Sequence, residues 1–275
     1  MTKALVAILV VLVGATSASA ADLPAQIYTK APTIADPGYS WTGAYVGGQA
    51  GARQTGSNWK ALCFESGLGP DCNSAPRFAG TVQGLDSTGP QFGGYAGYNL
   101  EVGSRAILGV EGDINWGHTK GSLAGGFPGL GGPPNTSVND HGFVSTGWNA
   151  SIRGRAGFLL VPSLLVYATG GVAFQQFGFN ANCPATDGGG WCDLDHNETV
   201  STTRTGYTAG FGIEQAFGLD GRMTTGGPWH ARIEYRYSDF GSLNHNFFAN
   251  TIDVIGVNFQ PLTTQTVQLG ISHQF

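Results

Sequence analysis

The sequence predicts an all-β protein: an eight-stranded, antiparallel, transmembrane up-and-down β-barrel with long extracellular loops. Three observations support this fold class. Eight segments alternate between apolar and polar residues with a period of two, as strands with two different faces do. The connections between these segments are alternately short and long. The chain is also poor in charge, with 11% charged residues and 45 glycines, whereas about a quarter of a typical soluble domain is charged.

The first 20 residues have the features of a secretory signal peptide. Lys3 supplies the positive charge, residues 4–13 form an apolar stretch, and the small residues 18–20 form a cleavage site. A transmembrane anchor is the alternative, but the apolar stretch is short for a spanning helix. We therefore expect cleavage after Ala20.

Residues 21–39 contain three prolines and show no periodicity. They predict an extended periplasmic N-terminal tail, and residues 40–275 predict the barrel. The eight expected strands are residues 41–52, 91–100, 105–116, 144–158, 164–179, 203–217, 229–240 and 263–275. Most are long enough to cross a bilayer when tilted. Short turns at one end and long loops at the other are typical of outer-membrane barrels. The long connections hold most of the Pro, Gly, Asn and Asp residues, so we expect irregular surface loops there.

The stretch WHARIEYRY, residues 229–237, shows the two faces most clearly. Its apolar face carries Trp229, Ile233 and Tyr235, and its charged face carries Arg232 and Glu234. In a secreted β-sandwich the charges would face water. Glycine favours the other interpretation, because it recurs on the polar faces of the predicted strands. Inside a narrow eight-stranded barrel, glycine makes room for large neighbours, so we expect the charges to face inward and the aromatic residues to face lipid.

The inward charges balance, and a charge in a narrow interior needs a partner. Glu111 lies at the depth of Arg153 on a neighbouring strand, and Glu214 at the depth of Arg232, so each is a candidate cross-strand pair. A structural plug is the simpler interpretation of these residues, and a gated pore whose pairs exchange partners is the alternative. The expected lumen charge network comprises Glu111, Asp113, Arg153, Arg155, Glu214, Arg232, Glu234 and Arg236.

Four cysteines remain after export, and an exported chain matures in an oxidising compartment. Both neighbouring pairs are separated by nine positions. We expect two local loop disulfides, Cys63–Cys72 and Cys183–Cys192, although four cysteines allow three pairings. Zinc is the competing interpretation, but zinc ligands usually lie two to four residues apart.

Four motifs together resemble the small outer-membrane immunogenic proteins of alphaproteobacteria. They are SWTGAYVGGQAG at 40–51, LGVEGDINW at 108–116, YATGGVAF at 167–174 and IEYRYSDFG at 233–241. The resemblance extends from the signal peptide to the C-terminus. It implies a porin-like eight-stranded barrel in the outer membrane of a Gram-negative bacterium, with surface-exposed loops and no defined catalytic residues. The cysteine pairs are not part of this pattern.

The C-terminus resembles the assembly signal of such barrels, polar–x–Gly–x–x–aromatic–x–aromatic. Gln268, Gly270 and Phe275 match it, and His273 stands where an aromatic residue is usual. We therefore expect the barrel-insertion machinery to bind this segment. Outer-membrane lipid is the other expected partner.

Three classes of function agree with these patterns. The first is a structural or porin-like barrel with antigenic loops, the second an adhesin or host-factor binder, and the third an outer-membrane enzyme. We expect no enzyme, because the histidines near strand ends, His118, His141 and His245, have no obvious partner. We expect no cofactor and no metal, and interpret the acidic stretch 191–198 as a solvated loop. The net charge of −5 argues against a nucleic-acid partner.

Overall fold

The computed structural model describes residues 39–66, 82–123, 140–184, 194–218, 227–249, 251 and 253–275. The predicted signal peptide, residues 1–20, lies outside this part, as does the predicted tail except for Tyr39. Every described element is a β-strand. The described residues include no helix that is long and apolar enough to cross a membrane.

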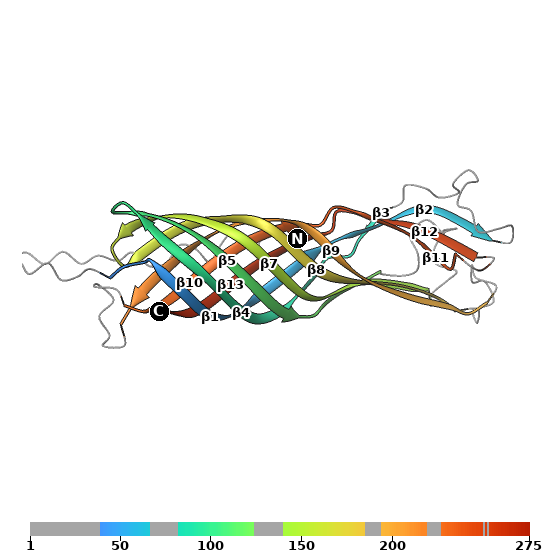
Figure 1. Ribbon diagram of the computed structural model, residues 1–275. Coiled ribbons are helices and arrows are strands. Elements are labelled where there is room, and N and C mark those ends of the chain that lie inside the picture. The colour runs from blue at the N-terminus through green and yellow to red at the C-terminus, as the bar shows by residue number, and fades with distance from the viewer. Residues whose placement is uncertain are drawn as a thin grey trace, which may run out of the picture. The chain divides into compact units, whose positions relative to one another are not determined.

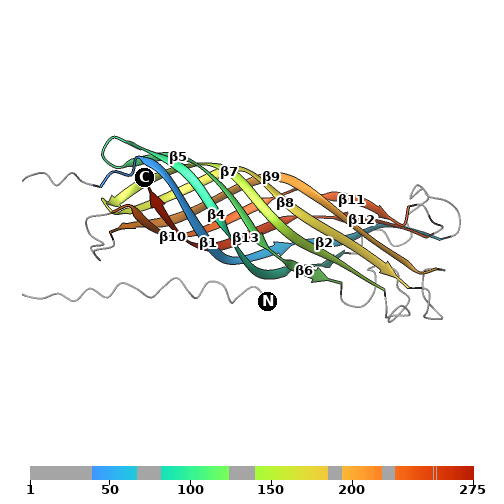
Figure 2. The ribbon, with the colours of Figure 1, turned by 60° about the horizontal axis from the view of Figure 1, so that its bottom comes forward.

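All eight predicted strands are present, which confirms the fold class. They are β1 (Gly43–Gly56), β4 (Ser87–Val102), β5 (Ala106–Gly117), β7 (His141–Val161), β8 (Leu164–Cys183), β9 (His196–Phe217), β10 (Trp229–Asp239) and β13 (Thr263–Gln274). Their antiparallel order is β5-β4-β1-β13-β10-β9-β8-β7, and the pairing of β5 with β7 closes the ring (Figure 1). The first and last strands are neighbours, since β1 pairs with β13 along its length (Figure 2).

The two ends of the ring differ. At one end the β4–β5 and β7–β8 connections are tight turns, and we call this the short-turn end. At the other, the long-loop end, β7, β8 and β9 continue past their predicted limits of residues 144, 179 and 203 to His141, Cys183 and His196. The pairing of β8 with β9 extends to Cys183 opposite His196, whereas β10 leaves β9 at Tyr207. Three strands therefore project beyond the rim of the barrel.

A second, four-stranded sheet lies within segments that the sequence predicted as irregular loops. It consists of β2 (Asn58–Ser66), β3 (Val82–Gly84), β11 (Leu243–Phe247) and β12 (Asp253–Phe259), in the order β11-β12-β2-β3. A further short strand, β6 (Thr119–Ser122), pairs with β7. The expectation of irregular loops is thus wrong for these residues. Figure 1 shows the four strands at the end where β8 and β9 extend.

The second sheet packs on the projecting strands through an apolar cluster. Phe179 of β8 lies 4.4 Å from Phe259 of β12, measured between ring centroids, and Trp59 of β2 stacks on Phe247 at 5.7 Å. All four rings are fully buried. We call this assembly of β2, β3, β11 and β12 on the extensions of β7–β9 the cap. Burial of several aromatic rings is the main source of its stability, because each removes a large apolar area from water.

The outside of the ring is apolar, as the alternation predicts. On β10, Arg232, Glu234 and Arg236 are buried and Ile233 is 41% exposed. Large apolar side chains on other strands, such as Ile152 and Phe211, are more than 60% exposed. Such a continuous apolar surface is unfavourable in water, but it is the surface that a lipid bilayer covers.

Candidate functional site: the lumen charge network

The eight predicted network residues come from four strands and all point into the barrel. β5 supplies two acids, β7 two arginines, β9 one acid, and β10 two arginines and one acid. Their side chains are at most 5% exposed, and the four arginines match the four carboxylates in charge. Every second residue of each strand points inward, and the pairing of neighbouring strands brings these residues to the same height in the barrel. Glu111, for example, lies opposite Arg153.

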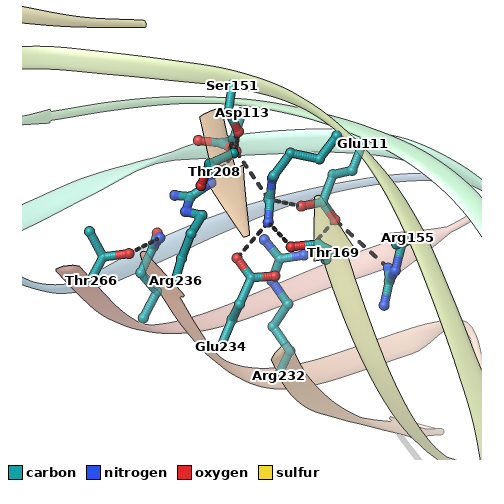
Figure 3. Close-up of polar contacts among 12 residues, drawn as sticks. Glu111, Asp113, Ser151, Arg155, Thr169, Thr208, Arg232, Glu234, Arg236 and Thr266 are labelled. Carbon is teal, nitrogen blue, oxygen red and sulfur yellow. Dashed lines mark hydrogen bonds and ion pairs between the residues drawn. The ribbon is translucent and has the colours of Figure 1, made fainter. Parts of the chain in front are cut away.

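Arg153 is the hub of the network. Its Nη1 lies 2.8 Å from Oε1 of Glu234 across the lumen, and its Nη2 lies 3.1 Å from Oδ2 of Asp113. Nη2 also forms an ion pair with Glu111, the cross-strand partner that the sequence predicted. In Figure 3 the side chains of Glu111 and Asp113, both from β5, point toward the same region of the lumen as that of Glu234, which comes from β10. A single guanidinium therefore connects β7 to both β5 and β10.

Arg232 and Arg236 of β10 reach across to the acids of β5. Arg232 Nη1 lies 2.5 Å from Glu111 Oε2, and Arg236 Nη1 lies 2.6 Å from Asp113 Oδ2. Arg232 Nη2 also donates to the amide oxygen of Gln49 at 2.7 Å. These contacts join strands that are not neighbours in the sheet, so the network braces the barrel across its interior.

The predicted pairing of Glu214 with Arg232 is wrong. The two residues are opposite in strand register, but the ion pairs of Glu214 join it to other groups. Its Oε2 lies 2.6 Å from Arg155 Nη2, and its Oε1 lies 2.8 Å from Nδ1 of His230. Long arginine side chains select partners by reach across the lumen, which strand register alone does not determine.

Tyrosine rings complete the packing around the arginines. The guanidinium of Arg232 lies 3.5 Å from the ring centroid of Tyr95, and that of Arg155 lies 4.1 Å from the centroid of Tyr167. The attraction between a guanidinium cation and the face of an aromatic ring stabilises the charged arginine, and it is stronger when both groups are removed from water. Glycine provides the space: a Cβ atom at Gly212 would lie 2.6 Å from Tyr167 Cζ. This agrees with the interpretation of the glycines on the polar faces.

Sequence reasoning missed several polar members of this site. Tyr45 donates to Glu111 Oε2 at 2.9 Å, Tyr167 donates to Glu234 Oε2 at 3.1 Å, and Ser151 hydrogen-bonds with Asp113 Oδ2 at 2.5 Å. Ser151 lies two residues before Arg153 on β7 and therefore shares its inward face. Judged by residue type alone, the two tyrosines would be expected to face lipid. Only their position in the inward–outward alternation of the strand identifies them as lumen residues.

The short-turn end of the interior is closed by an apolar cluster. Trp41, Ile107, Leu159 and Leu165 are buried there together. Trp41 donates its indole N–H to the carbonyl oxygen of Pro162 at 2.9 Å, which connects the chain before β1 to the β7–β8 turn.

Tyr39 adds to this closure from outside the first strand. It hydrogen-bonds with His230 and donates to the Gln274 side chain at 2.5 Å. Burial, together with the nearby negative charge of Glu214, raises the pKa of Tyr39 well above its ordinary value. The phenol therefore stays protonated and keeps its ability to donate.

The opposite side of the network is a layer of neutral polar side chains and one further arginine. Asn115 donates to Asp113 Oδ1 at 2.7 Å, and Thr119 hydrogen-bonds with Thr146 at 2.7 Å. Arg53 is fully buried in this layer and donates to the Gly147 carbonyl oxygen at 2.9 Å. Beyond it lies the apolar cluster of the cap. From one end to the other, the interior is thus apolar, charged, polar and apolar.

The remaining predicted residues are partly described. Gln268 is buried in the lumen, and Gly270 leaves space beside Tyr95 and Arg232. His273 contacts the ring of Phe275, which is 77% exposed. This geometry does not test an assembly signal, which stays a prediction.

The cysteines are described only in part. Cys63 and Cys183 are buried and neither is a free thiol. Cys72 and Cys192 lie outside the described residues, so the pairings stay predictions.

The expectation that His245 has no partner is wrong, because its Nε2 lies 2.8 Å from Oε1 of Glu198 in the cap.

Comparison with known proteins agrees with this architecture. Residues 7–275 match the family model of the outer membrane protein beta-barrel domain. The 31 kDa outer-membrane immunogenic protein of Brucella melitensis is 32% identical over 266 residues, which cover 95% of each chain. The 22 kDa outer membrane protein of Rhizobium leguminosarum bv. viciae is 29% identical and covers 81% of this chain and 80% of its own.

Among solved structures, the outer membrane protein OprG of Pseudomonas aeruginosa is similar to 85% of this chain and 97% of its own. Its TM-score is 0.46 and its sequence identity 11%. The relatives place this protein in the outer membrane of a Gram-negative bacterium, as the sequence predicted. The chain belongs to the outer membrane protein β-barrel domain family, within the group of alphaproteobacterial outer-membrane immunogenic proteins.

Proposed function

We propose that this protein is a closed structural barrel that displays an ordered cap on the cell surface and conducts no solute in its resting state. One observation carries the proposal: the interior is filled in successive layers, with the charge network between two apolar clusters. An eight-stranded barrel has an interior just wide enough for side chains. The cap supplies the surface-exposed antigenic part. This role needs no catalytic group.

The gated-pore alternative requires the network to separate. Arg153 and Glu234 connect opposite walls and are each at most 1% exposed. Breaking one buried ion pair without a new partner costs about 3–5 kcal/mol. A conformation that separates even one such pair is then populated below about 1%, since every 1.4 kcal/mol is about a factor of ten. The closed state therefore predominates unless a partner stabilises the open one.

Liposome swelling tests the closed barrel. Vesicles that contain the mature protein are diluted into an isotonic solution of a pentose, and light scattering follows the influx. We expect swelling no faster than in protein-free vesicles, with a large porin as the positive control. Swelling that increases in proportion to the amount of folded protein would refute the closed barrel. Heat-dependent gel mobility checks that the inserted protein is folded.

A second candidate function is binding of an extracellular partner by the cap. The observation that favours it is the separate four-stranded sheet, whose core residues Trp59, Ile255 and Phe259 are fully buried. An ordered surface fits a specific partner at a lower entropic cost than mobile loops do. The matched test measures the adhesion of bacteria to host cells. It compares bacteria that display the complete chain with bacteria that display a variant in which a short Gly-Ser turn replaces residues 58–84. Equal adhesion at equal surface amounts would exclude this function.

A further inference from the structure

A pocket of about 440 Å³ lies at the short-turn end of the barrel, between the β4–β5 turn and the end of β7. Its wall combines two charged residues, Glu101 and Arg105, with the apolar residues Leu160 and Val161. The pocket is separate from the lumen network. In outer-membrane barrels the short turns face the periplasm, so this pocket lies at the periplasmic surface of the bilayer.

The two charges of the pocket are of opposite sign and are not paired with each other. Glu101 is half-buried, and its Oε2 accepts the backbone N–H of Trp41 at 3.2 Å. Arg105 is exposed, and its guanidinium lies 5.9 Å from the ring centroid of Phe158. Within the described part of the chain, neither residue takes part in an ion pair. The pocket thus presents one anion and one cation to a ligand.

The surroundings of the pocket are apolar and face lipid. Phe158, Leu160 and Val161 on the β7 side are 48%, 52% and 51% exposed, and Leu100 and Val102 on the β4 side are 50% and 46% exposed. These residues belong to the apolar outer surface of the barrel, next to the acyl chains of the inner leaflet. A ligand that fits has a charged head of both signs and an apolar tail.

We propose that this pocket binds the headgroup of one zwitterionic phospholipid of the periplasmic leaflet. Arg105 contacts the phosphate, because a guanidinium matches the geometry of phosphate oxygens. Glu101 contacts the ammonium group, and the acyl chains lie along Phe158 and Leu160. An anionic phospholipid also supplies a phosphate for Arg105, but it has no ammonium group for Glu101 and places a negative charge near that carboxylate. The pocket therefore discriminates between the two lipid classes.

The test is native mass spectrometry of the folded protein in detergent, titrated with phosphatidylethanolamine or phosphatidylglycerol. We expect one ethanolamine lipid to bind about tenfold more tightly than the glycerol lipid, which corresponds to about one charge-assisted hydrogen bond. Arg105→Gln should weaken binding of the ethanolamine lipid about tenfold. Glu101→Gln can still accept the Trp41 N–H, and should abolish the preference between the two lipids.

Lys120→Gln is the matched control, because Lys120 is an exposed cation at the long-loop end, and it should leave both affinities unchanged. Arg105→Lys keeps the charge but loses the guanidinium geometry, so it should bind the ethanolamine lipid more tightly than Arg105→Gln and more weakly than the wild-type protein. Equal affinity of the wild-type protein for the two lipids would overturn the proposal. So would an unchanged preference in Glu101→Gln, or a loss in Lys120→Gln as large as that in Arg105→Gln.

Discussion

The ion pair between Arg155 and Glu214 offers a direct test of the energetics of the lumen. Arg155 Nη2 lies 2.6 Å from Glu214 Oε2, and both side chains are 1% exposed. Arg155→Met removes the charge and keeps an unbranched apolar stem beside Tyr167. Glu214 then retains His230 as its partner. Removing one member of a buried pair costs about 3–5 kcal/mol, and we expect a loss of free energy of unfolding near the lower value.

Glu214→Gln removes the other charge of the same pair and should cost a similar amount, reduced by the contact of Arg155 with Glu111 at 3.7 Å. The double variant should recover about 1–3 kcal/mol of the summed loss, as contacting residues do in double-mutant cycles. The matched cycle combines Arg232→Met with Glu214→Gln. These two residues are opposite in register but bind other groups, so their coupling should be smaller.

Equilibrium urea unfolding of the protein in lipid vesicles measures these differences, with tryptophan fluorescence and heat-dependent gel mobility as independent probes. Losses below about 1 kcal/mol in both single variants are typical of exposed charges. Such a result would show that the network lies in open water, and it would refute the reasoning. A larger coupling for Arg232 with Glu214 than for Arg155 with Glu214 would contradict the partners seen in the structure.

Three other predictions concern the wall and the assembly of the barrel. Gly212→Val should lower the free energy of unfolding by about 1–3 kcal/mol through overpacking. Gly154→Val should not, because a Cβ atom there would lie 3.9 Å from its nearest neighbour. Equal effects of the two substitutions in the same urea titration would argue against glycine as a spacer. Ile152→Arg should cost about 2–4 kcal/mol if this residue faces the bilayer centre. Leu194→Arg, at a residue that is also more than 60% exposed but lies next to the start of β9 at the long-loop end, should cost almost nothing. A harmless Ile152→Arg would contradict the lipid-facing assignment. Deletion of Phe275 should reduce the amount of heat-modifiable protein in the outer membrane relative to a cap variant, and normal levels would remove this residue from the assembly signal.

The barrel strands and their faces could be predicted because alternation is a local property. A period of two places every second residue on one face, so the stretch at 229–237 identifies its own inward side. Glycines at positions such as 212 and 270 then indicated a filled interior. All eight strands and the burial of the network residues follow from this pattern.

The ion-pair partners could not be predicted, because they depend on the distance across the lumen. Arg232 extends to Glu111 on a strand that is not its neighbour, while the opposite residue in register, Glu214, binds elsewhere. Sequence spacing determines which residues share a level, but the width of the barrel determines which of them touch.

The cap was missed because its strands are short and pair over long sequence distances. β2 pairs with β12, from the other end of the chain. A signal was present: the buried residues Trp59, Ala61 and Cys63 lie two positions apart, and so do the buried residues Ile255, Val257 and Phe259. Glycines, prolines and asparagines nearby led to the interpretation as irregular loops, because these residues usually mark turns.

Single-channel recording in a planar bilayer tests the central claim that the barrel is closed. The folded, full-length mature protein is added to one side, insertion is verified by heat-dependent gel mobility of the same preparation, and current is recorded in concentrated potassium chloride. The closed interior predicts no lasting conductance steps in the wild-type protein, and rare steps at most in Arg153→Met, which lacks the hub of the network. Regular, long-lived steps of uniform size in the wild-type protein would show a continuous water path through the lumen and would contradict this account.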